Sequence, residues 1–138
     1  MESYVVDASI ILKWIIGEDK EPDRDKALEI LKLWTEGHIE LYAPALWKYE
    51  VGNFLGRIMP ESAREQMQLL LDLKIHDVDL SWEAITYCFE LMEKYRVTFY
   101  DASYLASARD LNATLVTADE KFARKVNKPN IIRILKEL

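Results

Sequence analysis

The chain has 138 residues, of which 50% are hydrophobic and 30% charged, a composition that suits one globular domain over 1–138 and excludes a disordered chain. Its 18 basic and 24 acidic residues give a net charge of −6, which argues against a simple electrostatic grip on nucleic acid but leaves room for an enzyme whose metal ions supply positive charge. The single cysteine excludes a disulfide framework. No apolar run approaches the ~20 residues of a membrane span, and the N-terminus lacks the basic region of a signal peptide. We therefore expect a cytoplasmic protein.

The hydrophobic pattern predicts short strands alternating with helices. We expect strands or extended segments at 3–6, 39–42, 75–80, 114–116 and 131–134, and helices at 9–16, 23–36, 45–58, 61–73, 81–95, 100–111 and 119–126. Ser9 and Ser81 are expected to cap their helices, Gly37 to end another, and the strand at 39–42 to stop before Pro44. This alternation is typical of an α/β fold with a mainly parallel sheet.

Charge is unevenly distributed along this pattern. Residues 121–138 hold six lysines and arginines against one acid, Glu137. We interpret this basic tail as the solvated faces of the final helix and strand.

Four acids stand out by their positions. Asp7 and Asp119 follow predicted strands, and open α/β sheets bind ligands beyond the carboxyl ends of their strands. A helical wheel places Glu50 and Asp101 among apolar residues of their helices. Because a buried carboxylate without a partner is costly, one solution is that all four acids meet around a shared divalent cation.

Each acid also has a simpler interpretation. Asp7 could merely end a strand, and Glu50 could extend to solvent at the rim of its helix. Thr98-Phe-Tyr-Asp101 and Thr117-Ala-Asp-Glu120 both resemble capping boxes. We assign Glu120 mainly to capping and keep Asp119 for chemistry.

Other chemistries fit less well. His38 and His76 lie far apart and are expected at the surface or at strand edges, and Cys88 is expected in the core. No glycine-rich phosphate loop and no Gly-x-Ser-x-Gly elbow occurs. The tryptophans fall on predicted helices, where core and partner-surface positions both stay open; they are Trp14, Trp34, Trp47 and Trp82.

Four motifs follow one another along the chain: Val-Val-Asp7-Ala-Ser9, Pro44-x-Leu46-x-x-x-Glu50-x-x-Asn53, Tyr100-Asp101-Ala-x-Tyr-Leu-Ala and Leu-Val-Thr117-Ala-Asp119-x-x-Phe122. In this order they resemble the PIN-domain ribonucleases, and most of all the toxin subunits of VapBC toxin–antitoxin pairs. The resemblance spans nearly the whole chain. It implies a single-domain, three-layer α/β/α PIN-like fold whose central sheet has about five short strands.

The resemblance also implies a site and a reaction. The implied metal-binding acids are Asp7, Glu50, Asp101 and Asp119. The implied supporting residues are Ser9, Asn53 and Thr117. Carboxylate ligands favour Mg²⁺ or Mn²⁺, and the implied reaction is metal-assisted hydrolysis of RNA phosphodiester bonds, leaving 5′-phosphate and 3′-hydroxyl ends. The implied partners are RNA, a small antitoxin protein that inhibits through a cationic side chain, and a second copy in a homodimer.

Other functions stay open beside the toxin of a type II toxin–antitoxin system. The chain could be a non-catalytic PIN-like module that binds protein or RNA, or a stand-alone RNA-processing nuclease. A phosphoryl-transfer domain with Asp7 as nucleophile fits less well, because Ala8 and Ser9 follow where a second acid is usual.

Overall fold

The computed structural model describes residues 1–17 and 21–138. At its centre is a five-stranded sheet in the order β3-β2-β1-β4-β5, and its four strand pairings are parallel. The strands are β1 (Glu2–Val6), β2 (Ile39–Pro44), β3 (His76–Val78), β4 (Thr114–Thr117) and β5 (Ile132–Ile134). The predicted α/β fold with a parallel sheet is confirmed.

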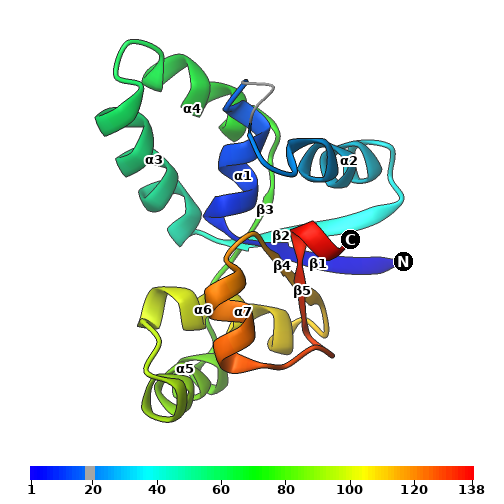
Figure 1. Ribbon diagram of the computed structural model, residues 1–138, viewed down its shortest axis with the longest axis vertical. Helices are drawn as coiled ribbons and strands as arrows, with labels where there is room; N and C mark the ends of the chain where they lie inside the picture. The colour runs from blue at the N-terminus through cyan, green and yellow to red at the C-terminus, as the bar shows by residue number, and fades with distance from the viewer. Residues whose placement is uncertain (18–20) are drawn as a thin grey trace.

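Helices cover both faces of this sheet (Figure 1). On one side lie α1 (Ala8–Ile15), α2 (Arg24–Thr35), α3 (Leu46–Ile58) and α4 (Ala63–Asp72). On the other side lie α5 (Trp82–Tyr95), α6 (Phe99–Asp110) and α7 (Glu120–Val126). A 3-10 turn over Leu135–Glu137 follows β5. These are the three layers that the resemblance implied.

Two hydrophobic cores, one on each face of the sheet, hold the layers together. Val5 and Leu115 pack with α5, α6 and α7, whereas their neighbours Val6 and Val116 pack with α1 to α4. This alternation follows from the two-residue period of a strand. Cys88 is buried in the first of these cores, as predicted.

The strand order changes direction between β1 and β4. From β1 the chain builds β2 and β3 on one side, and then returns to build β4 and β5 on the other. The crevice at such a switch point is where ligands bind in open α/β sheets. Asp7 directly follows β1 and Thr117 is the last residue of β4, so both lie at this point.

Two helices are capped by acids, and for the first of them this differs from the prediction. Asp7, and not Ser9, is the N-cap of α1, where its carboxylate accepts a hydrogen bond from the Ile10 backbone N–H at 3.3 Å. Asp119 is the N-cap of α7 and accepts from the Phe122 N–H at 3.0 Å. Aspartate is among the best N-cap residues, so both acids have a structural role besides any chemical one.

The capping role assigned to Glu120 is therefore wrong. Thr117 is still part of β4, which moves the helix start two residues past the threonine of the expected capping box. Glu120 is the first residue of α7, and its carboxylate lies 3.6 Å from Arg124 and 3.5 Å from Lys136. Two residues of the basic tail are thus engaged at the surface of α7.

Two further predicted helix N-caps and one predicted helix C-terminus are confirmed, whereas one predicted strand end is not. Ser81 caps α5 and Thr98 caps α6, each accepting from the backbone N–H three residues on, at 3.0 Å. Gly37, just after α2, has a φ of 80°, which glycine adopts without strain. The exception is Pro44, which lies inside β2 and pairs in register with Val78.

The tryptophans divide between core and surface. Trp14 and Trp47 are buried in the core beneath α1 to α4, so they line no partner surface, and Trp34 is half-buried. Trp82 is 71% exposed. The two histidines are exposed. Among residues 1–17 and 21–138, no helix has both the length and the apolar character that crossing a bilayer requires.

Candidate active site

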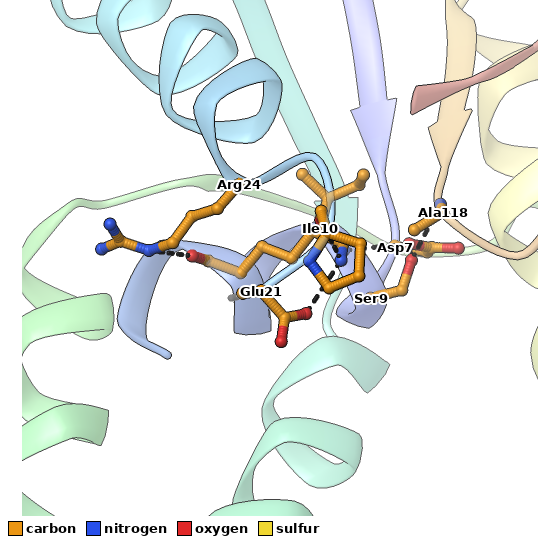
Figure 2. A network of polar contacts seen from close by, with 8 residues as sticks. Asp7, Ser9, Ile10, Glu21, Arg24 and Ala118 are labelled. Atoms are coloured by element: carbon orange, nitrogen blue, oxygen red, sulfur yellow. Dashed lines mark hydrogen bonds and ion pairs between the residues drawn. The ribbon is translucent and has the colours of Figure 1, made fainter. Parts of the chain in front are cut away.

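Asp7 is tied to the end of β4 by hydroxyl groups. The Ser9 hydroxyl donates to Asp7 Oδ1, and the Thr117 hydroxyl donates to Oδ2. Ser9 Oγ in turn accepts from the Ala118 backbone N–H at 3.1 Å (Figure 2). Two of the expected supporting residues therefore contact the first acid directly and fix its orientation.

Burial raises the pKa of the Asp7 carboxyl to about 6, even though its hydrogen bonds with Ser9, Thr117 and Ile10 favour the charged form. The negative charge of Glu50 raises it further. In the described part of the chain, no lysine or arginine lies within ion-pair distance of Asp7. A nearby cation would compensate for the desolvation and favour the carboxylate.

Glu50 extends from α3 and meets Tyr104 from α6. The Tyr104 hydroxyl donates to Glu50 Oε1 at 2.5 Å. Burial raises the pKa of the half-buried Glu50 carboxyl, the Tyr104 bond opposes this, and the charge of Asp101 adds to it. Burial and the Glu50 carboxylate raise the pKa of the Tyr104 phenol far above its ordinary value, so the phenol stays a hydrogen-bond donor.

Asp101 and Asp119 complete the set. Asp101 lies half-buried in the first turn of α6, where its backbone N–H donates to Thr98 Oγ1. Burial raises the pKa of its carboxyl, and the charge of Asp119 raises it further. Asp119 is exposed, and its backbone N–H donates to Thr117 Oγ1 at 3.0 Å.

The four acids thus lie in a row in space, each with its negative charge next to that of another. Asp7 is repelled by Glu50, Glu50 by Asp101, and Asp101 by Asp119. Among the described residues, however, no three His, Cys, Asp or Glu side chains are close enough together to hold a metal ion between them. The structure brings the acids to one edge of the sheet without closing them around a common point.

Asn53 was predicted as a site residue, whereas Tyr104 contacts the site and was not predicted. Asn53 is exposed on α3 and makes no side-chain hydrogen bond within residues 1–17 and 21–138, so its supporting role stays a prediction. Tyr104 was not among the predicted site residues. Its signal was its position three residues after Asp101, on the same face of the helix.

A parallel sheet with acids gathered at its switch point is what the sequence motifs of the PIN domain led us to expect. Residues 4–128 match the family model of the PIN domain, and the chain belongs to this family.

Two relatives assign the chain to one group within this family. It is 30% identical over 131 residues to ribonuclease VapC3 of Pyrobaculum aerophilum, covering 88% of this chain and 92% of the relative. It is also 30% identical over 142 residues to ribonuclease VapC1 of Mycobacterium tuberculosis H37Rv, covering 99% of this chain and all of the relative. Within the PIN family, the chain belongs to the VapC ribonucleases.

Solved structures confirm the fold. VapBC2 from Rickettsia felis, bound to a DNA fragment from its promoter, matches with a TM-score of 0.71 and 21% identity, covering 96% of this chain and 98% of that one. A toxin–antitoxin complex from Klebsiella pneumoniae matches with a TM-score of 0.70 and 16% identity, covering 98% and 99%.

Proposed function

We propose that this chain hydrolyses RNA phosphodiester bonds with Mg²⁺ or Mn²⁺, at the sheet edge beyond β1 and β4. The observation that carries the proposal is the gathering of four acids there, with no basic side chain of the described chain paired to any of them. Like charges crowd in this way at lower cost when a cation offsets them. Both relatives named above are ribonucleases.

The donor chemistry fits a hard cation. Carboxylate oxygens suit Mg²⁺ and Mn²⁺ better than zinc. Mg²⁺ is usually held by one or two carboxylates together with waters and substrate phosphates, so three converging side chains are not required before RNA binds. We assign ligand roles, direct or through water, to Asp7, Asp101 and Asp119. When bound, the metal would lower the pKa of a water molecule and offset charge on the scissile phosphate.

The chain's own groups have distinct tasks in this scheme. Ser9 and Thr117 orient Asp7, and because Oδ1 also accepts from the Ile10 N–H, the acceptor position that stays free lies on Oδ2. Glu50 either binds the ion or accepts a proton from the attacking water, for which a carboxyl pKa raised by burial is suited.

The experiment is incubation of purified protein with end-labelled RNA in Mn²⁺, with EDTA as the control. We expect metal-dependent cleavage that leaves 5′-phosphate and 3′-hydroxyl ends. A protein that binds Mn²⁺ but leaves every RNA tested intact would support the non-catalytic alternative.

We also propose that the chain is the toxin of a type II pair, held inactive by a small antitoxin. Support comes from its likeness to a structure described as a toxin–antitoxin complex. The acidic sheet edge favours a cationic inhibitory group, and an arginine is the best fit because its planar fork binds carboxylates through two hydrogen bonds. Co-expression with the reading frame directly upstream tests this: the two products should co-purify and suppress RNA cleavage.

A homodimer is a further part of the proposal. Exposed aromatic side chains on α5 and α6 support it, namely Trp82, Phe89 and Tyr100. Large exposed apolar side chains can mark a protein interface. Light scattering after size exclusion measures the mass, and Phe89→Ser is expected to shift a dimer toward monomer.

A further inference from the structure

Tyr104 reaches the candidate active site from the protein interior. Its side chain is 3% exposed and belongs to the core beneath α6, whereas Glu50 extends from α3 on the opposite face of the sheet. The hydrogen bond from the Tyr104 hydroxyl to Glu50 Oε1 therefore joins the two helical layers at the site.

The hydroxyl has little freedom to move. The ring is packed in the core formed with α5 and α7, where the residue is 3% exposed. Tyr104 thus connects α6 with α3. Within the described residues, it is the one side chain that hydrogen-bonds the Glu50 carboxylate.

The Glu50 side chain, in contrast to Tyr104, is flexible. Its carboxylate is half-buried at the end of a side chain with three rotatable bonds, which loses much rotamer freedom when it is fixed. A hydrogen bond to a charged oxygen is among the stronger restraints available, and a fixed phenol supplies it here.

We propose that Tyr104 is a positioning residue: its hydroxyl holds Glu50 Oε1 and leaves Oε2 for the metal ion or the attacking water. This inference rests on the proposed function. The competing explanation is that a buried phenol merely needs a hydrogen-bond partner, in which case its loss would affect stability and not the metal or the reaction.

The test uses Tyr104→Phe, which removes only the hydroxyl and keeps the ring, in the full chain. Tyr87→Phe is the matched control, since Tyr87 is half-buried on α5 with its ring against Arg109. For wild type and both variants we would measure kcat and KM for RNA cleavage, Mn²⁺ affinity by electron paramagnetic resonance, and the fold by circular dichroism at the assay temperature.

Partners that orient metal-site groups are typically worth about 10- to 100-fold in affinity or activity. We expect Tyr104→Phe to lower kcat, Mn²⁺ affinity or both by about this factor, with KM for RNA within about twofold of wild type. Tyr87→Phe should match wild type. In a Glu50→Gln background, adding Tyr104→Phe should change Mn²⁺ affinity by less than about twofold, because the group it positions is already altered.

Two results would overturn the inference alone: an active wild type with an unchanged Tyr104→Phe variant, or an equal loss of Mn²⁺ affinity with and without Glu50→Gln. A wild-type chain that neither binds Mn²⁺ nor cleaves RNA would overturn the proposed function, and the inference with it.

Discussion

The Thr117 hydroxyl donates a hydrogen bond to the Asp7 carboxylate, joining the ends of β4 and β1. The Thr117 side chain is fully buried, and its oxygen also accepts from the Asp119 backbone N–H at 3.0 Å. One hydroxyl therefore contacts two of the four acids where the strand order reverses. This explains how segments 110 residues apart are held in register at the site.

Replacing Thr117 with valine should remove the contact between β4 and Asp7 with little change in side-chain volume. Thr117→Val loses both hydrogen bonds and leaves the partly buried Asp7 carboxylate short of a donor, which costs about 1–3 kcal/mol of unfolding free energy. We also expect slower RNA cleavage. Urea unfolding and cleavage rates measure these effects, with Thr114→Val at the start of β4 as the control. Equal behaviour of the two variants would contradict the role given to Thr117.

Asp7 should make the metal-free protein less stable as the pH rises. Its folded-state pKa of about 6 lies above the ordinary value of 3.8, so the folded protein binds the proton more tightly than the unfolded chain does. The resulting stabilisation is present at low pH and is lost as the pH rises through 6. A shift of this size corresponds to about 3 kcal/mol.

Asp7→Asn removes this titration. In EDTA, the unfolding free energy of the variant relative to wild type should therefore rise between pH 4 and pH 7.5, by up to about 3 kcal/mol. Urea unfolding at the two pH values measures the difference. A pH-independent difference would mean that Asp7 has an ordinary pKa.

A divalent metal should stabilise the wild type. A ligand that binds only the folded state adds about 2.7 kcal/mol at a hundred times its dissociation constant. Thermal unfolding with Mn²⁺ and with EDTA measures the shift in Tm, and Asp101→Asn should reduce it. An identical shift in the variant would remove Asp101 from the metal site.

Asp119 allows its capping and chemical roles to be separated. Asn is as good an N-cap as Asp, so Asp119→Asn should unfold within about 0.5 kcal/mol of wild type, whereas Asp119→Ala should lose about 1 kcal/mol. Both variants should cleave RNA poorly if the carboxylate binds metal. Full activity in Asp119→Asn would leave Asp119 with the capping role alone.

The sequence predicted what depends on local pattern. Apolar periodicity located the strands, and the rule that sites form beyond parallel strand ends selected Asp7 and Asp119. Glu50 and Asp101 were found because an acid on an apolar helix face needs an explanation. Each of these signals is contained within a dozen residues.

What depends on long-range packing was not predicted. Asp7 and Ser9 are both good N-cap residues, and the choice between them follows from the pairing of Val6 with Val116, which ends β1 one residue before Asp7. Tyr104 resembles any core tyrosine until α3 and α6 are placed together. The same is true of the Thr117 contact with Asp7.

The central claim is that these carboxylates support metal-dependent RNA cleavage, and one comparison on a single helix tests it most directly. Asp101 lies at the start of α6, and Asp110 lies at its end, where it accepts a hydrogen bond from Ser81 at 2.6 Å. With labelled RNA and Mn²⁺, wild type and Asp110→Asn should cleave at similar rates, whereas Asp101→Asn should be slower by about 100-fold or more. Cleavage by Asp101→Asn at the wild-type rate, or wild-type cleavage that persists in EDTA, would contradict the account.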